Sequence, residues 1–164
     1  MIIGLLLFLF VTFAAFSQNM EIEVNGNITF DNSMFTITEA GNDFPASVEN
    51  TNSVYVSLLY SSFWDKIFSP NRKWRINIQK ADLIWDPNLT LEIIRSGDGV
   101  RPWRGGINIH DGISYQTITN TPTYFFRGKN EVNTVPLDFK LSGVSVTMGA
   151  TNFETNILLT VYDD

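Results

Sequence analysis

The stretch that decides the fold class is VPLDFKLSGVSVTMGATNFETNILLTVYDD, residues 135–164. It contains three apolar runs, at 135–141, 144–148 and 153–162, separated by short breaks that contain glycine or asparagine. Gly and Asn are typical of tight turns because they tolerate backbone conformations that other residues avoid. The stretch therefore predicts three short strands joined by tight turns.

The same succession of short strands and turns continues through the rest of the chain. The clearest strand is 73–79, where Trp74, Ile76 and Ile78 alternate with polar residues, as on a strand with one wet face. Further strand candidates lie at 20–30, 34–38, 54–60, 89–95, 107–109, 115–119 and 123–127. Turn-rich or loop segments lie at 39–52, 63–70 (with one helical turn), 83–87, 96–106 and, in hairpin-like form, 127–130. Turn signals roughly every 8–12 residues predict an all-β, antiparallel, immunoglobulin-like β-sandwich of about 8–10 strands.

The length and composition of the chain are those of one globular domain. It has 164 residues, 44% of them hydrophobic, which is enough to bury a core without cross-links. The sequence has no cysteine, so disulfides and a lipid anchor on cysteine are excluded. Because there is no repeat and no long linker, we interpret residues 18–164 as a single β-sandwich domain.

Residues 1–17 have the pattern of a signal peptide. An apolar run leads to Ala15-Phe16-Ser17, a small-x-small cleavage motif after which Gln18 would be the first residue. No Lys or Arg precedes the run, which leaves open whether Met1 is the true start. A membrane anchor is the alternative, but the run is shorter than the roughly 20 residues of a typical span. The sequence thus predicts a secreted, periplasmic or cell-surface protein with no membrane span after cleavage. Its Ala-Phe-Ser-Gln junction and its many Asn, Phe and Ile residues resemble those of exported bacterial proteins.

Acidic and basic residues are separated along the sequence. The chain has 17 Asp and Glu against 11 Lys and Arg, which disfavours nucleic-acid binding because that function needs a basic surface. All 11 basic residues lie between Lys66 and Lys140, whereas 18–65 and 141–164 contain acidic residues and no basic one. Strands from the acidic ends can pair with the basic middle inside one molecule. Alternatively, copies can associate head to tail, which gives an open fibre unless the rotation closes.

No pattern in the sequence identifies catalytic chemistry. His110 is the only histidine, and the neighbouring Asp111 would point to the opposite face of a strand. The nucleophile motif G-x-S-x-G is absent, and one histidine without cysteine disfavours a zinc site. Carboxylates in loop-like sequence could serve glycosidase chemistry or bind calcium, but Asp is common in turns for structural reasons. These carboxylates are Asp82, Asp86, Asp98 and Asp111. We predict a non-enzymatic protein without a cofactor or metal.

The best ligand candidates are aromatic and basic residues in the connecting segments. Exposed Trp rings stack on sugars and Arg binds carboxylates, so such residues suggest a glycan partner. They are Trp64, Trp85, Arg101, Trp103 and Arg104. The competing interpretation is that each Trp covers one end of the sandwich core, since large aromatic side chains are usually mostly buried.

The order of features in 135–164 resembles the closing strands of a group of exported proteins. The strand VPLDFKLSGVSV, the break TMGATNF and the strand ETNILLTVY are similar to the C-terminal part of bacterial fimbrial-subunit and spore-coat-protein-U-like sandwiches. The resemblance implies a non-enzymatic immunoglobulin-like domain, and many members of the group assemble by lending a strand to a neighbour. Members often carry cysteines, which this chain lacks.

Strand lending requires an extended apolar segment that completes a sheet lacking one strand. Segments 18–30 and 153–162 have this form, although within one molecule they would simply complete the sandwich. Their alternating apolar residues are Ile22, Val24, Ile28, Phe30, Phe153, Ile157, Leu159 and Val161. The sequence therefore predicts a structural or adhesive (pilin-like, cell-adhesion) surface protein, a subunit of an extracellular filament or coat whose neighbours are other copies. A carbohydrate-binding module that uses the Trp- and Arg-bearing loops is the alternative.

Overall fold

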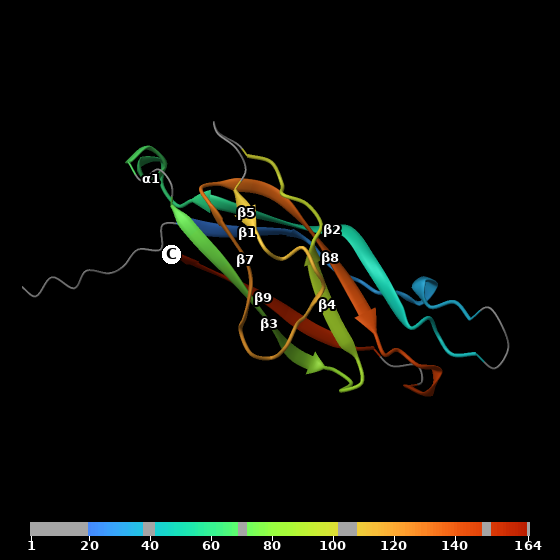
Figure 1. Ribbon diagram of the computed structural model, residues 1–164. Coiled ribbons are helices and arrows are strands. Elements are labelled where there is room, and N and C mark those ends of the chain that lie inside the picture. Colours follow the sequence, from blue (N-terminus) through green and yellow to red (C-terminus); the bar gives the residue numbers. More distant parts are fainter. Residues whose placement is uncertain (1–19, 38–41, 69–71, 102–107, 149–151, 164) are drawn as a thin grey trace, which may run out of the picture.

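The computed structural model shows two antiparallel sheets packed face to face (Figure 1). The residues that it describes are 20–37, 42–68, 72–101, 108–148 and 152–163. The predicted signal peptide at 1–17 lies outside the described residues.

Within the described residues, the first sheet contains five strands and the second contains four. The order in the first sheet is β1 (Met20–Gly26), β2 (Ser47–Tyr60), β8 (Val132–Ser142), β4 (Thr90–Arg95) and β6 (Gln116–Thr117). The order in the second sheet is β5 (Ile109–His110), β7 (Thr123–Lys129), β3 (Lys73–Ile84) and β9 (Glu154–Asp163). The predicted all-β antiparallel sandwich is therefore confirmed.

From β2 onward, successive strands lie in opposite sheets, with the even-numbered strands in one and the odd-numbered strands in the other. Each connection from β2 onward therefore crosses from one sheet to the other. The hairpin predicted at 127–130 is wrong, because β7 continues to Lys129 and the chain then crosses to β8 in the other sheet. The turn residue Asn130 has a φ of 60°, and its carbonyl accepts a hydrogen bond from Nε1 of Trp74 at 2.7 Å. Local turn residues reveal a change of direction, but they do not reveal which sheet receives the next strand.

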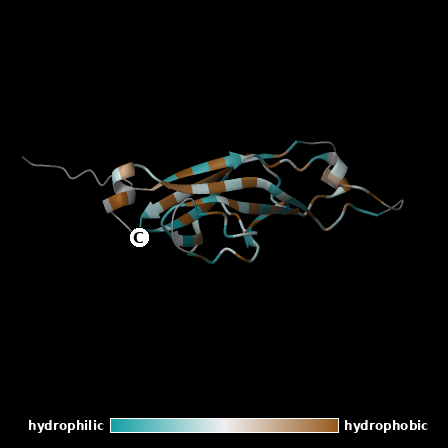
Figure 2. Ribbon diagram, turned by 90° about the horizontal axis from the view of Figure 1, so that it is seen from above, coloured by the Kyte–Doolittle hydropathy of each residue, from teal (hydrophilic) through white to brown (hydrophobic). Residues whose placement is uncertain are grey.

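The core lies between the sheets and follows the alternation of the strands, which Figure 2 shows as hydrophobic and hydrophilic bands. Trp74, Ile76 and Ile78 of β3 are fully buried, as the sequence predicted. The Trp74 ring meets the Phe126 ring edge to face, with the centroids 5.9 Å apart. The first sheet contributes the buried side chains Val54, Val56, Leu58, Leu91, Ile93, Val135, Leu137 and Phe139.

In the parts of the chain that the structure describes, three short helical elements connect the strands. They are α1 (Phe63–Phe68) and the 3-10 turns η1 (Asn32–Met34) and η2 (Val146–Met148). The helical turn predicted within 63–70 is confirmed. The strand predicted at 34–38 does not form over 34–37, which begins with the last residue of η1, and residue 38 lies outside the described residues; η2 occupies most of the strand predicted at 144–148. Met34, Phe35, Val144 and Met148 pack against the core instead of pairing in a sheet, whereas Ile37 and Val146 are exposed. A segment of five residues, three of them apolar, is too short to distinguish a paired strand from a turn that covers the core.

Pairing within one molecule brings the acidic ends of the sequence onto the basic middle. β9 pairs with β3 along its whole length, and the guanidinium of Arg75 lies 5.2 Å from the centroid of the Tyr162 ring. β2 pairs with β8, which places Glu49 opposite Lys140. Lys140 Nζ also lies 2.7 Å from a carboxylate oxygen of Glu92 on β4.

Candidate functional site: an apolar groove between β1 and β9

The sandwich opens along the side where β1 and β9 face each other. Each is the edge strand of its sheet: β1 pairs with β2 and β9 with β3. Near the C-terminal end of β9, Met20 and Val161 are buried and line a small pocket of about 300 Å³. Further along, the inward side chains become more exposed, and Val24 reaches 49% exposure. The two edges therefore close the core at one end and leave it accessible at the other.

The accessible part forms a groove of about 1100 Å³, which we call the β1–β9 groove. One wall is β1 with the chain that follows it, and the other wall is β9 with the residues before it. The base consists of buried side chains of the first sheet and its loops: Val54, Leu89, Leu91, Phe139 and Leu141. The rim at the end distant from α1 consists of Phe35, Phe44, Val144, Ser145 and Met148. The groove is thus lined mainly by apolar side chains with a few polar groups at its edges.

All eight residues of the two predicted assembly strands lie around this opening. Six line the β1–β9 groove: Val24, Ile28, Phe30, Phe153, Ile157 and Leu159. The other two, Ile22 and Val161, line the adjacent small pocket. The structure thus makes two segments that are far apart in the sequence the opposite walls of one site. The base and rim residues were not predicted, and the aromatic Phe44 within turn-rich sequence was the available signal.

Asp43 fastens the rim of the groove. Its carboxylate accepts hydrogen bonds from Ser145 Oγ at 2.7 Å and from the backbone N–H of Val146 at 2.9 Å. The backbone N–H of Phe44 also donates to it, at 2.8 Å. These hydrogen bonds, with that from Ser145 first, hold the pKa of the Asp43 carboxyl below its ordinary value of 3.8. The carboxylate therefore joins segment 42–46 to η2 across the end of the groove.

The rim is expected to loosen in acid. Because the pKa of Asp43 is lowered in the folded state, its stabilising contribution is present above about pH 4 and is lost as the pH falls through the folded-state pKa. The rate of hydrogen exchange at the Val146 amide, which donates to the Asp43 carboxylate, measures how firmly the rim is held. Protection corrected for intrinsic exchange should fall on acidification in the native protein and should be low at every pH in Asp43→Ala. Equal protection of Val146 in both proteins at about pH 6 would contradict the assignment.

The charge around the groove is acidic. Glu154 lies in its wall, and Asp31, Asp43 and Asp86 lie in the adjoining segments. The sequence has no Lys or Arg in 24–50 or 143–160. The nearby Lys80 is engaged elsewhere, with Nζ 2.8 Å from Asp82 and 4.5 Å from the centroid of the Trp85 ring. The groove therefore suits an apolar partner that carries positive charge at its edges.

The predicted Trp and Arg ligand residues that the structure describes do not form a single surface. Trp64 lies in α1 and is 64% exposed, whereas Trp85 follows β3 at the opposite end of that strand. Trp85 is half-buried, lines the groove and donates from Nε1 to the carbonyl of Leu89 at 3.2 Å. Arg101 follows Val100, which bridges to Asn133 beside the start of β8. The remaining two predicted residues, at 103 and 104, lie outside the described residues.

The carboxylates considered for catalysis have structural partners. Asp111 accepts from the hydroxyl of Tyr124 and lies 3.5 Å from Nε of Arg127. Asp82 bonds Lys80, Thr155 and Asn120, and these hydrogen bonds outweigh the effect of burial and lower its pKa. Asp98 pairs with Arg95, and Asp86 accepts from the backbone N–H of Asn88. Within the described part of the chain, no three His, Cys, Asp or Glu residues are grouped so that they could hold a metal ion.

No protein-family model matches the sequence, and no curated protein or solved structure is significantly similar to it. In the described segments, every helix is too short or too polar to cross a membrane. The functional argument therefore rests on the β1–β9 groove and on the surfaces that could fill it.

Proposed function

We propose that the protein is a non-enzymatic, secreted structural or adhesive protein of the bacterial surface, whose copies assemble into a filament or coat through the β1–β9 groove. The observation that supports this proposal is the coincidence of an apolar groove with two sheet edges. In the described residues, β1 and β9 each have a strand neighbour on one side only. Such edges offer backbone hydrogen-bonding groups to a partner, and apolar grooves beside them accept extended segments or protruding side chains.

In a single molecule, the apolar side chains of the groove remain partly exposed to water, which is unfavourable. Ile28, Phe30 and Ile157 pack against the core but are only partly buried. Burying apolar area yields roughly 25 cal/mol per Å², so covering these side chains with a partner stabilises the assembly. The acidic charge of the rim disfavours nucleic acid as that partner. The export signal predicted at 1–17 would place the protein where it meets other copies at the cell surface.

Substitution of Val24 by lysine should abolish assembly without unfolding the domain. Val24 lies at the groove wall and is half exposed, so a lysine can be accommodated in the monomer but would place a charge in the interface. Analytical ultracentrifugation should show association of the native protein, whereas Val24→Lys should stay monomeric up to at least about ten times the concentration at which the native protein associates. Phe153→Ser, on the opposite wall, should act in the same direction.

Ile113→Lys provides the matched control, because Ile113 is exposed and lies away from the residues that line the groove. It should associate like the native protein. Circular dichroism of each variant checks that the sandwich is retained. A native protein that is monomeric at all concentrations and forms no filaments on cells would overturn the proposed function.

Carbohydrate binding is the other proposed function, and it now rests mainly on the exposed Trp64 in α1. A sugar ring stacks on such an indole face. Glycan-array binding that is retained in Val24→Lys and lost in Trp64→Ala would favour this function over assembly. If the native protein binds no glycan, carbohydrate binding is excluded as its function.

A further inference from the structure

A group of exposed hydrophobic side chains protrudes at α1. Phe63 is 65% exposed, Trp64 is similarly exposed, and Ile67 follows one turn later at 49%. The rings of Phe63 and Trp64 meet edge to face, with their centroids 5.9 Å apart. We call these three residues the α1 knob. Large apolar side chains that gather on a surface mark an interaction site more often than single ones do.

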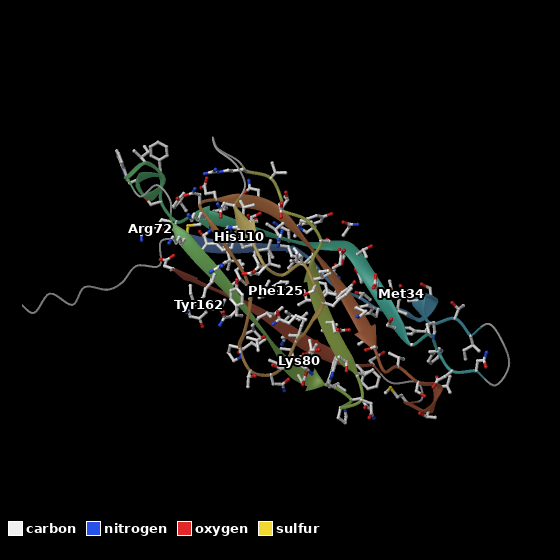
Figure 3. The ribbon with its side chains drawn as sticks, viewed as in Figure 1. Met34, Arg72, Lys80, His110, Phe125 and Tyr162 are labelled. Carbon is white, nitrogen blue, oxygen red and sulfur yellow. The ribbon has the colours of Figure 1, made fainter. Side chains whose placement is uncertain are left out.

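The α1 knob and the groove rim lie at opposite ends of the molecule (Figures 1 and 2). α1 follows the last residue of β2, whereas the first residues of β2 adjoin the rim. A strand of 14 residues separates them by on the order of 40 Å. Figure 3 shows the same separation, with Arg72 near α1 and Met34 at the far end. The knob of a molecule therefore cannot reach the rim end of that molecule's own groove.

The charges near the two surfaces are complementary. The sequence that follows Trp64 is basic on balance: residues 65–75 contain one acidic residue, Asp65, and four basic ones, Lys66, Arg72, Lys73 and Arg75. Acidic residues line and surround the groove: Asp31, Asp43, Asp86 and Glu154. An apolar knob with a basic flank matches an apolar groove with an acidic rim, and such complementarity favours the correct orientation of two partners.

We infer that the α1 knob of one copy inserts into the β1–β9 groove of the next copy, so that the copies join head to tail. This inference rests on the proposed function and names the surface that fills the groove. The two contact surfaces differ, so every added copy presents a new knob and a new groove. Head-to-tail contacts of this kind generate an open filament unless the rotation between copies closes a ring.

The contact area is sufficient for specific but reversible association. Phe and Trp side chains bury roughly 150–250 Å² each when covered. The α1 knob and the groove walls around it would together lose on the order of 1000 Å² of accessible surface, about the lower limit for specific protein interfaces. The assembly should therefore depend on concentration. Because charges flank the contact, it should also weaken as ionic strength rises from about 0.05 to about 0.5 M.

Mixing two complementary variants tests the inference. The knob variant Phe63→Ser/Trp64→Ser keeps the groove, and the groove variant Val24→Lys keeps the knob. Neither should form chains alone. An equimolar mixture should form a 1:1 heterodimer, because one intact knob and one intact groove remain to pair. Sedimentation velocity and native mass spectrometry with one variant isotope-labelled distinguish this heterodimer from homodimers.

The outcomes separate the inference from the proposed function. If the knob variant forms chains like the native protein while Val24→Lys does not, the groove is filled by another segment, such as a lent strand, and the inference fails alone. If both variants are monomeric but their mixture forms no heterodimer, the knob contacts a different surface and the inference also fails. If the native protein does not associate, both fail. Ile113→Ser, an exposed apolar residue outside both surfaces, should behave like the native protein.

Discussion

Trp74→Ala should lower the free energy of unfolding by roughly 3–5 kcal/mol, the largest loss expected for a single substitution in this chain. The Trp74 side chain is fully buried and packs edge to face on Phe126. Its removal leaves a cavity between the sheets. It also removes the Nε1 hydrogen bond to the Asn130 carbonyl, which holds the crossing from β7 to β8. Urea denaturation followed by far-UV circular dichroism measures the change.

Two further variants separate the contributions of this side chain. Trp74→Phe keeps an aromatic ring but loses the hydrogen bond and part of the volume, so its loss should be roughly 1–2 kcal/mol. Trp64→Ala is the matched control, since the same change at an exposed position should shift stability by no more than about 0.5 kcal/mol. Equal losses for Trp74→Ala and Trp64→Ala would contradict the burial described here.

The burial of Trp74 could be predicted because the alternation in 73–79 is local information. Period-two alternation shows which side chains share a face, and the apolar face of a strand must be covered. Similar reasoning predicted most of β4, β7, β8 and β9, although their ends differ by a few residues. The composition of 47–52 predicts a turn-rich segment, but this segment forms the start of β2. Its Asn and Glu residues lie on a part of the strand that has one exposed face. Composition alone did not reveal that pairing with β8 continues to Ser47.

The groove could be predicted only in part. Its two walls were identified as strands with an apolar face that could join a partner, but the sequence did not show that they lie opposite each other. That arrangement follows from the sheet order, in which β1 and β9 are both edge strands. The rim depends on the bond between Asp43 and Ser145, two residues about a hundred positions apart. No local sequence pattern predicts a hydrogen bond between residues so far apart in the chain.

Gly26→Ala should both destabilise the domain and remove assembly. Gly26 is the last residue of β1, pairs with Val54 of β2 and has a φ of 106°. Few side chains tolerate this backbone conformation, which costs of order 1–3 kcal/mol in residues other than glycine. In addition, a Cβ at this position would lie 1.9 Å from the backbone carbonyl oxygen of Ser53. We therefore expect a loss of roughly 2 kcal/mol or more in the free energy of unfolding, measured by urea denaturation.

The effect on assembly follows from the position of Gly26 at the start of the groove wall. The methyl group cannot be accommodated unless the end of β1 moves away from β2, and Ile28 and Phe30 move with it. Association in the ultracentrifuge should then fall to the level of Val24→Lys, while Asn25→Ala, one residue earlier and exposed, should leave both stability and association nearly unchanged. A Gly26→Ala protein that is destabilised yet associates normally would show that segment 27–30 does not contact the partner. The contact would then involve the parts of the groove outside segment 27–30, which are Val24, the base, β9 and the rim.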